Sequence, residues 1–302
     1  MNFASLAILL TLLTLGYVCA RLSVFADNAA ETLNRFVIYV SLPALVLQLV
    51  PKLRWEPGLY ILVLTPWLLL AVGACLVWLA ARACGWSRQV LGALLLCVPL
   101  GNTSFLGFPL LTAILGPDSV RLAVLFDQLG SFLIVSTYGL LVLARFSGGQ
   151  TPSLGVVAQR VLKFPPFLSL AAGLALGWTG WSYPAPVTAL LARVGDTLVP
   201  LAMFAVGLKL QLRPPRQWGA LGFGLAVKLV VLPLVALVLV RLLGTPALPA
   251  EVAVLEAGMP TMITAGALAM LAGLAPELAA ALVGYGIVLS LATVPAWATL
   301  LR

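Results

Sequence analysis

The sequence predicts an all-α membrane protein in which ten transmembrane helices form two five-helix repeats of opposite orientation. Three observations support this prediction: an unusually apolar composition, apolar runs of membrane-spanning length, and a match between the two halves of the chain. Of the 302 residues, 62% are hydrophobic and only 9% are charged, and the mean hydropathy is +1.13. Soluble domains carry about 25% charged residues, so most of this surface must face lipid.

Apolar runs of about 17–25 residues, the length of a helix that crosses a hydrocarbon core, recur along the whole chain. No basic residue precedes the first run, so we expect a retained helix there and not a cleaved signal peptide. Numbered from first to tenth, the segments are expected at residues 3–20, 33–51, 58–81, 89–115, 120–144, 164–181, 194–212, 217–243, 250–272 and 278–301.

The net charge of +8 comes from basic residues at helix ends, which set orientation in a membrane protein and are not a sign of nucleic-acid binding here. Ten of them follow the odd-numbered segments and six lie on the opposite face, so both termini are expected outside the cytoplasm of a multi-pass inner-membrane protein. The ten are Arg21, Arg35, Arg82, Arg88, Arg145, Arg160, Lys163, Lys209, Arg213 and Arg216; the six are Lys52, Arg54, Arg121, Arg193, Arg241 and Arg302.

The two halves of the chain, residues 1–149 and 158–302, correspond when the sequence is shifted by 157 positions. All five segments of the first half then fall on segments of the second half, and Gly101 falls on Gly258, as Pro43 does on Pro200. A polar stretch at 146–153 separates the halves. Because five is odd, the second repeat must begin on the other side of the membrane, as in the inverted repeats of secondary transporters.

The fourth segment contains residues that would disrupt an ordinary spanning helix near mid-membrane. Prolines lack a backbone donor, and glycines weaken the hydrogen-bonded ladder. A single cluster of this kind could be a proline kink in which Ser and Thr bond back to their own helix. The disruptive residues of this segment are Pro99, Gly101, Asn102, Thr103, Ser104, Gly107 and Pro109.

The ninth segment is interrupted at the repeat-related position, by Gly258, Pro260 and Thr261. Two discontinuous helices at corresponding places indicate a transporter binding site near the membrane midplane. Each interruption creates a new helix N-terminus, whose free N–H groups attract anions. The candidate substrate-binding residues are therefore Gly101, Asn102, Thr103, Ser104, Gly258, Pro260 and Thr261.

Three ionisable residues, Asp127, Lys228 and Glu256, fall inside apolar segments, where charges are costly and often functional. They are candidates for ion coupling, or a structural ion pair of Lys228 with either carboxylate. Gln48 and Gln128 are expected to be interhelical hydrogen-bond partners. No cofactor or metal site is expected, since histidine is absent and the four cysteines, interpreted as free thiols in the protein core, lack metal-ligand spacing. H⁺ or Na⁺ remains open as a coupling ion.

The function that these features favour is secondary transport of a small organic anion, and not an enzymatic reaction. No phosphate-binding loop for direct nucleotide-driven transport and no His-Glu-x-x-His metal motif is present in the sequence. The alternatives are a symporter of another small solute, a channel, an intramembrane enzyme and a scaffold without a ligand. Inverted repeats with discontinuous helices favour alternating access over a channel.

Three stretches resemble the auxin efflux carrier family, in its bacterial branch: residues 101–111 in the fourth segment, residues 36–45 in the second, and Met259-Pro260 in the ninth. The resemblance covers the whole chain. It implies a fold like that of bile acid–sodium symporters, with the fourth and ninth helices crossing at the substrate site. Small carboxylates are the implied substrates: auxin in plants, and dicarboxylates such as malate in some bacterial members.

The resemblance also implies how the molecule moves and assembles. The first, second, sixth and seventh helices would form a scaffold that joins a homodimer through the second and seventh. The third to fifth and eighth to tenth helices would form a transport domain with an elevator-type motion. Plant members carry proline where this chain has Gly101, and a second proline where it has Ala265. These departures point away from auxin itself.

Overall fold

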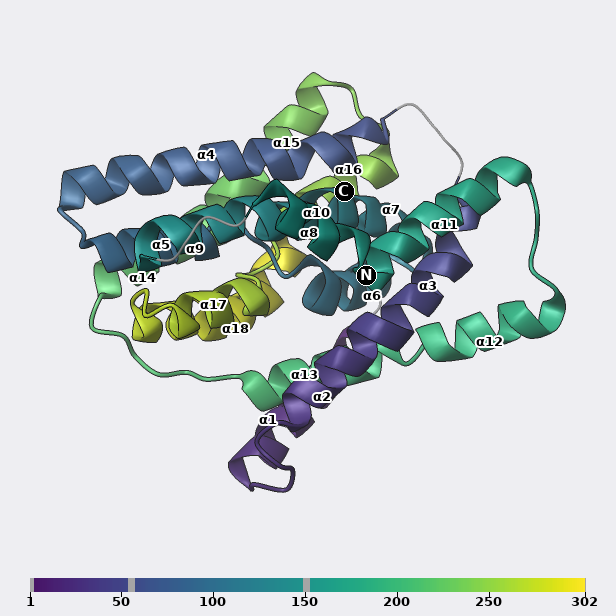
Figure 1. Ribbon diagram of the computed structural model, residues 1–302, viewed down its shortest axis with the longest axis horizontal. Helices are drawn as coiled ribbons and strands as arrows, with labels where there is room; N and C mark the ends of the chain where they lie inside the picture. Colours follow the sequence, from purple (N-terminus) through teal and green to yellow (C-terminus); the bar gives the residue numbers. More distant parts are fainter. Residues whose placement is uncertain (1–2, 54–57, 149–152, 302) are drawn as a thin grey trace. The chain divides into compact units, whose positions relative to one another are not determined.

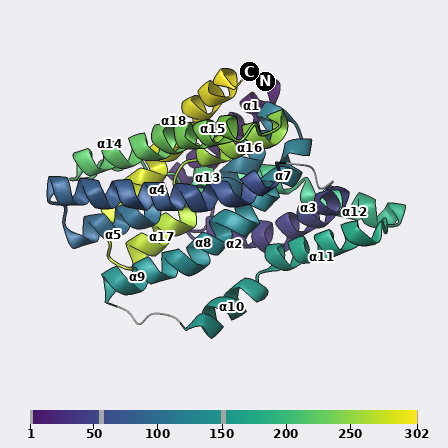
Figure 2. The same cartoon turned by 90° about the horizontal axis from the view of Figure 1, so that it is seen from above.

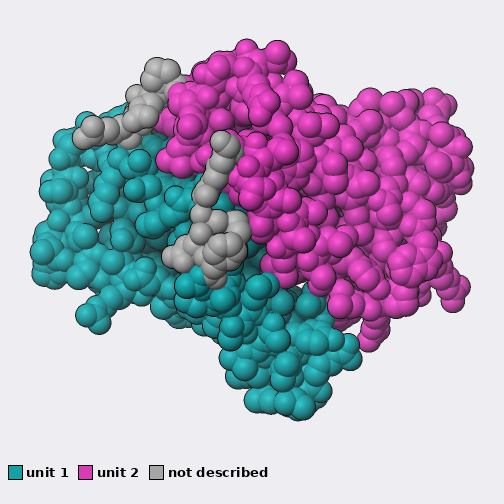
Figure 3. All heavy atoms as spheres, turned by 180° about the vertical axis from the view of Figure 1, so that it is seen from behind, with its two compact units in different colours: residues 1–56, 104–124, 159–210 teal, residues 57–103, 125–158, 211–302 magenta. Residues whose placement is uncertain are grey.

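The computed structural model describes residues 3–53, 58–148 and 153–301 (Figure 1). Within these ranges the regular structure is helical, apart from one isolated β-bridge between Gly101 and Thr261. The predicted all-α class is confirmed. The chain divides into two compact units (Figure 3): unit 1 comprises residues 1–56, 104–124 and 159–210, and unit 2 comprises residues 57–103, 125–158 and 211–302.

Unit 1 is built from the N-terminal helices and from helices in the middle of the chain. Its elements are α1 (Phe3–Arg21), α2 (Ala29–Phe36), η1 (Val37–Ser41), α3 (Leu42–Leu49), η2 (Val50–Lys52), α6 (Phe108–Leu115), α11 (Pro165–Thr179), α12 (Ala185–Gly195) and α13 (Leu198–Lys209). Three further elements, η3 (Thr103–Gly107), α7 (Asp118–Phe126) and α10 (Leu154–Leu162), cross the boundary between the two units.

Glycines allow α1 and α13 of unit 1 to pack with their backbones in contact. A Cβ atom at Gly207 would lie 2.1 Å from the carbonyl oxygen of Leu13, and one at Gly16 would lie 2.2 Å from that of Phe204. No side chain fits at such a distance, so this pairing requires glycine on both helices. Small residues at helix interfaces are common in membranes, where close backbone approach supplies much of the packing energy.

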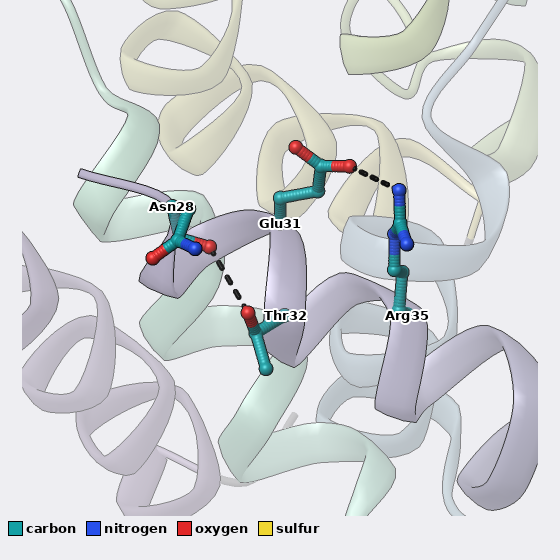
Figure 4. A network of polar contacts seen from close by, with 4 residues as sticks. All are labelled: Asn28, Glu31, Thr32 and Arg35. Carbon is teal, nitrogen blue, oxygen red and sulfur yellow. Dashed lines mark hydrogen bonds and ion pairs between the residues drawn. The ribbon is translucent and has the colours of Figure 1, made fainter. Parts of the chain in front are cut away.

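The second segment begins with a polar turn of helix in α2. Arg35 Nη2 lies 2.7 Å from Glu31 Oε1, and the Thr32 hydroxyl donates to the Asn28 carbonyl oxygen at 3.2 Å (Figure 4). The Arg35 and Glu31 side chains are largely exposed, and such ion pairs contribute about 0.3–0.5 kcal/mol when they join residues one helical turn apart. This turn extends the second helix four residues beyond the predicted start at 33.

Unit 2 contains the longest helices and most of the C-terminal part of the chain. Its elements are α4 (Tyr60–Cys84), α5 (Arg88–Cys97), η4 (Asp127–Ser131), α8 (Phe132–Ile134), η5 (Val135–Gly139), α9 (Leu140–Ser147), α14 (Trp218–Ala226), η6 (Val227–Val231), α15 (Leu232–Leu242), α16 (Ala247–Ala257), α17 (Ile263–Leu271) and α18 (Pro276–Leu300). Figures 1 and 2 show α4 folding back at a short turn so that α5 runs beside it.

Seven helices in the described part of the chain are long and apolar enough to cross a membrane. This confirms a multi-pass membrane protein, whereas the count of ten spans stays a prediction. Of the three remaining segments, the sixth corresponds to the 15-residue helix α11, and the fourth and ninth are interrupted. The seven spans are Ala4–Arg21, Ala29–Lys52, Tyr60–Cys84, Asp118–Ser147, Ala185–Lys209, Trp218–Leu242 and Pro276–Leu300.

Wide π-helical turns occur in several helical segments of the chain, and three of these turns end two residues before a proline. The prolines are Pro43, Pro109 and Pro233, which follow η1, η3 and η6. Proline lacks the N–H that would bond to the carbonyl four residues earlier, and its ring clashes with that carbonyl. A widened turn relieves the clash and leaves a carbonyl free for another donor. For Pro233, the free carbonyl is that of Leu229, four residues earlier, which accepts a hydrogen bond from Trp297 Nε1 at 2.9 Å.

All four cysteines are free, as expected, but only Cys97 is buried. Cys75 and Cys84 lie on the exposed face of α4, and Cys19 on α1 is partly exposed. The interpretation of these thiols as core residues is therefore wrong for three of the four, because a helix surface that faces lipid is apolar even though it is not packed inside the protein.

Candidate functional site

The fourth and ninth segments are both interrupted in unit 2, where the sequence predicts a break. α5 ends at Cys97 and α16 ends at Ala257. The stretches 98–102 and 258–262 that follow them are not helical. Proline and glycine in each stretch explain the endings, since neither residue supports a continuing ladder of helical hydrogen bonds.

The two interrupted stretches pair with each other through their backbones. Asn102 N–H donates to the Pro260 carbonyl at 2.8 Å, and Met262 N–H donates to the Leu100 carbonyl at 2.9 Å. This exchange satisfies backbone groups that would be costly if left alone inside a membrane protein. It also occupies two of the backbone N–H groups that the sequence predicts as donors to an anion, so a ligand would depend more on side chains.

Two side chains at this pairing have polar atoms without a hydrogen-bond partner. Asn102 and Thr261 are each 1% exposed, and neither the Asn102 Nδ2 amide nor the Thr261 Oγ1 hydroxyl has a partner. Buried polar atoms are nearly always bonded, so an unpartnered pair beside a chain break needs an explanation. A ligand that accepts hydrogen bonds would supply one.

Thr103, the next residue along, donates its hydroxyl to Asp127 Oδ1, on η4. Gln128 Nε2 donates to the other carboxyl oxygen of Asp127 at 2.6 Å. The interhelical bond expected of Gln128 is thus a contact with its own neighbour in the chain. Two donors stabilise a carboxylate, because hydrogen bonds to a charged group are the stronger kind. Asp127 therefore fixes the orientation of Thr103 beside Asn102.

Lys228, on η6, reaches the end of α16. Its Nζ donates to the Ala257 carbonyl at 3.0 Å, and the residue is 2% exposed. A cation is favourable at the C-terminal end of a helix, where free carbonyls and the helix dipole are negative. Neither carboxyl oxygen of the adjacent Glu256 has a hydrogen-bond partner, and this residue is completely buried. The ion pair of Lys228 and Glu256 that the sequence allowed thus has no direct hydrogen bond.

A small cavity lies beside these groups, within unit 2. Its volume is about 10 Å³, room for roughly one water molecule. Its walls include Gly101, Thr103, Ser131, Lys228 and Glu256. A carboxylate ligand is several times larger, so this cavity would have to widen to hold one.

The structure brings together most of the residues that the sequence singled out, all of them in unit 2. Ser104, the remaining candidate, belongs to unit 1. Among the described residues, no group of three Asp, Glu or Cys side chains could hold a metal ion. The members in unit 2 are Gly101, Asn102, Thr103, Asp127, Lys228, Glu256, Gly258, Pro260 and Thr261.

Sequence reasoning missed the helical irregularity that carries the polar side chains. Thr103, Asp127 and Lys228 each lie on a wide π-helical turn, η3, η4 and η6 respectively. Such turns occur often at functional sites because they redirect a side chain without ending the helix. The prolines that follow η3 and η6 could have indicated these wide turns in the sequence. No proline follows η4 at the corresponding position.

Comparison with known proteins gives one family and several relatives. Residues 1–298 match the model of the family described as membrane transport protein. An uncharacterized transporter of Methanothermobacter thermautotrophicus is 30% identical over 97% of this chain and 96% of its own length. One of Methanocaldococcus jannaschii is 26% identical over 84% of each chain. A Rhizobium meliloti protein named "Putative malonate transporter" is 28% identical over 96% of this chain and 93% of its own.

The family match spans nearly the whole chain and includes both interrupted segments. The relatives named above carry the name of transporter, and none of them is named as an enzyme. The expectation that the chain is not an enzyme agrees with this. The protein therefore belongs to the family of membrane transport proteins, the auxin efflux carrier family that its fourth segment resembles.

Proposed function

We propose that the protein is a secondary transporter of a small organic anion, a carboxylate, which binds where the fourth and ninth segments pair. The observation that carries this proposal is the pair of buried, unpartnered groups at that point, Asn102 Nδ2 and Thr261 Oγ1. An amide N–H and a hydroxyl can replace part of the hydration that an anion loses. Being neutral, they leave no unpaired charge when the site is empty.

Malonate is the first substrate to test, because a relative that aligns with nearly the whole chain carries that name. Neutral hydrogen-bond donors at interrupted helices can bind a carboxylate, but they do not distinguish one small carboxylate from another. A symporter of another small solute is the second candidate, since the same groups can bond any acceptor. A coupling ion, H⁺ or Na⁺, would act through Asp127, Glu256 or Lys228, which are buried beside the pairing.

An elevator-type mechanism of alternating access is the motion we propose. The division of the chain supports it, because the first, second and sixth segments and nearly all of the seventh fall in unit 1. The third, eighth, ninth and tenth fall in unit 2, whereas the fourth and fifth are divided between the units. The small size of the cavity is also in line with a site that must widen to take its ligand.

The proposed setting is the inner membrane, with ten spans in two inverted repeats (1–149 and 158–302) and both termini outside the cytoplasm. The basic bias of the loops supports this orientation. A homodimer through the second and seventh helices is proposed from the family resemblance alone.

Thermal unfolding of the purified protein against a panel of small carboxylates tests the proposed function. A ligand at a hundred times its dissociation constant stabilises the folded state by about 2.7 kcal/mol. We expect malonate or a close relative to raise the melting temperature, and comparison with and without Na⁺ at two pH values to identify a coupling ion. Exchange of radiolabelled substrate across proteoliposomes, with the substrate recovered unchanged, would then separate transport from an enzymatic reaction. A panel without any stabilising carboxylate would contradict the proposal.

A further inference from the structure

The two buried carboxyl groups of the site differ in their surroundings. Asp127 accepts from Thr103 Oγ1 on one oxygen and from Gln128 Nε2 on the other. Glu256 is 0% exposed, and neither of its oxygens has a hydrogen-bond partner. The same chemical group is thus bound by donors at one position and left without them at the other.

This difference bears on which group carries a proton. An ionised carboxylate in the protein interior needs donors or a close counter-charge, and without them the neutral form is favoured. Donors stabilise the ionised form. We propose that Glu256 holds the exchangeable proton of this site, and that Asp127 stays ionised and acts as a positioning residue for Thr103.

The charges of the surrounding groups agree with this assignment. The charge cluster consists of Asp127, Lys228 and Glu256, and the first two both act electrostatically on Glu256. With Glu256 protonated, the negative Asp127 and the positive Lys228 cancel; with Glu256 ionised, the cluster would carry an excess negative charge in the membrane interior. Lys228 is already engaged with the Ala257 carbonyl.

Other charged side chains on the helices packed against α16 lie away from this point. They occupy terminal turns: Arg82 in the last turn of α4, Arg241 in the last turn of α15 and Glu277 in the first turn of α18. Tyr285, also on α18, packs against the ring of Trp218. Among the described residues, the charged groups that act on Glu256 are thus those of the charge cluster.

The cavity offers a way for the proton to reach this carboxyl. Glu256, Thr103 and Ser131 line it, and it has room for about one water molecule. Water would deliver a proton to a Glu256 oxygen when the site faces one side of the membrane and remove it on the other. This coupling rests on the proposed function, because it supposes a site that alternates; an anion that binds while Glu256 is protonated then crosses with one proton.

Infrared spectroscopy of the purified protein tests the assignment without any substrate, since a protonated carboxyl and a carboxylate absorb at different frequencies. At neutral pH we expect the band of a protonated, buried carboxyl group in the wild type. The band should disappear in Glu256→Gln and persist in Asp127→Asn. Glu251→Gln is the matched control, because it makes the same change on the same helix in a residue outside the site, and it should keep the band.

A band that survives in Glu256→Gln, or that is lost in Asp127→Asn, overturns the assignment. Should Glu256→Gln fail to fold, the Asp127→Asn spectrum still decides: a retained band supports Glu256, and a lost band refutes it. Absence of the band from the wild type also refutes the proposal.

Transport measurements separate this inference from the proposed function. In proteoliposomes, malonate uptake is measured with and without a proton gradient and divided by the rate of malonate exchange. In the wild type this ratio should rise with the gradient, whereas in Glu256→Gln it should not change. Asp127→Asn should keep the ratio but need more malonate for half-maximal exchange, and Glu251→Gln should behave as the wild type. A wild type that shows the Glu256 band but exchanges no carboxylate would leave the protonation intact and refute the function.

Discussion

Single residues of the candidate site show what a local sequence pattern can indicate and what it cannot. Asn102, Thr103 and Thr261 were predicted because proline and glycine next to polar residues are rare within a spanning helix. Their partners were not predictable in this way. Thr103 bonds to Asp127, 24 positions away, and Lys228 bonds to Ala257, 29 positions away. Such contacts depend on how separate helices pack, which no local pattern contains.

Thr103→Ala should destabilise the protein by about 1.5–3 kcal/mol, because it removes a hydrogen bond to the buried carboxyl group of Asp127, which we propose to be ionised. Thermal unfolding in detergent would measure the loss as a lower melting temperature. Thr103→Ser keeps the hydroxyl group and should therefore retain most of the wild-type stability. The control is Thr137→Ala, whose hydroxyl donates to the Leu133 carbonyl one turn earlier in its own helix. If Thr103→Ala is no less stable than this control, Asp127 does not depend on Thr103.

At the scale of the element, the prolines explain why helices of this chain widen where they do. Sequence reasoning treats a proline as a kink or an end. In η6 and α15, the helix continues through Pro233 by opening one turn, and the Leu229 carbonyl takes a bond from another helix. The interruptions of the fourth and ninth segments were predictable from residue type, whereas the backbone pairing between them was not.

Trp297→Phe should lower stability by about 1–3 kcal/mol, because it leaves the buried Leu229 carbonyl without a donor. In a Pro233→Ala background the effect should shrink, since alanine supplies a backbone N–H one helical turn after Leu229. Melting temperatures of the wild type, both single variants and the double variant form the necessary cycle. Equal costs of Trp297→Phe in both backgrounds would show that Pro233 is not the reason for the bond.

For the whole molecule, composition was sufficient to predict a helical membrane protein, but not its number of spans. A hydropathy profile depends on which residues a segment contains and not on whether its helix is continuous. Segments such as 89–115 and 250–272 therefore read as spans although their helices stop partway. The division into two units is likewise not visible in the sequence, because each unit assembles stretches from three parts of the chain.

The number of spans decides where the termini lie. Ten spans place both ends on the same side, whereas the seven long helices alone would place them on opposite sides. We expect reporter fusions at the N-terminus and the C-terminus of the full chain to be extracytoplasmic: an alkaline phosphatase should be active at either end. A phosphatase active at one end only would refute the ten-span arrangement.

The central claim, that a carboxylate binds where the fourth and ninth segments pair, is tested most directly by the affinity of Asn102→Ala for malonate. A hydrogen bond to a charged group contributes about 1.5–3 kcal/mol, so the dissociation constant should rise about ten- to a hundredfold. Titration calorimetry on the purified wild type and on Asn102→Ala supplies the measurement. The control is Asn34→Ala, which changes an asparagine of α2 in unit 1. We expect Asn34→Ala to bind as the wild type does. A folded Asn102→Ala protein with wild-type affinity for malonate would contradict the account.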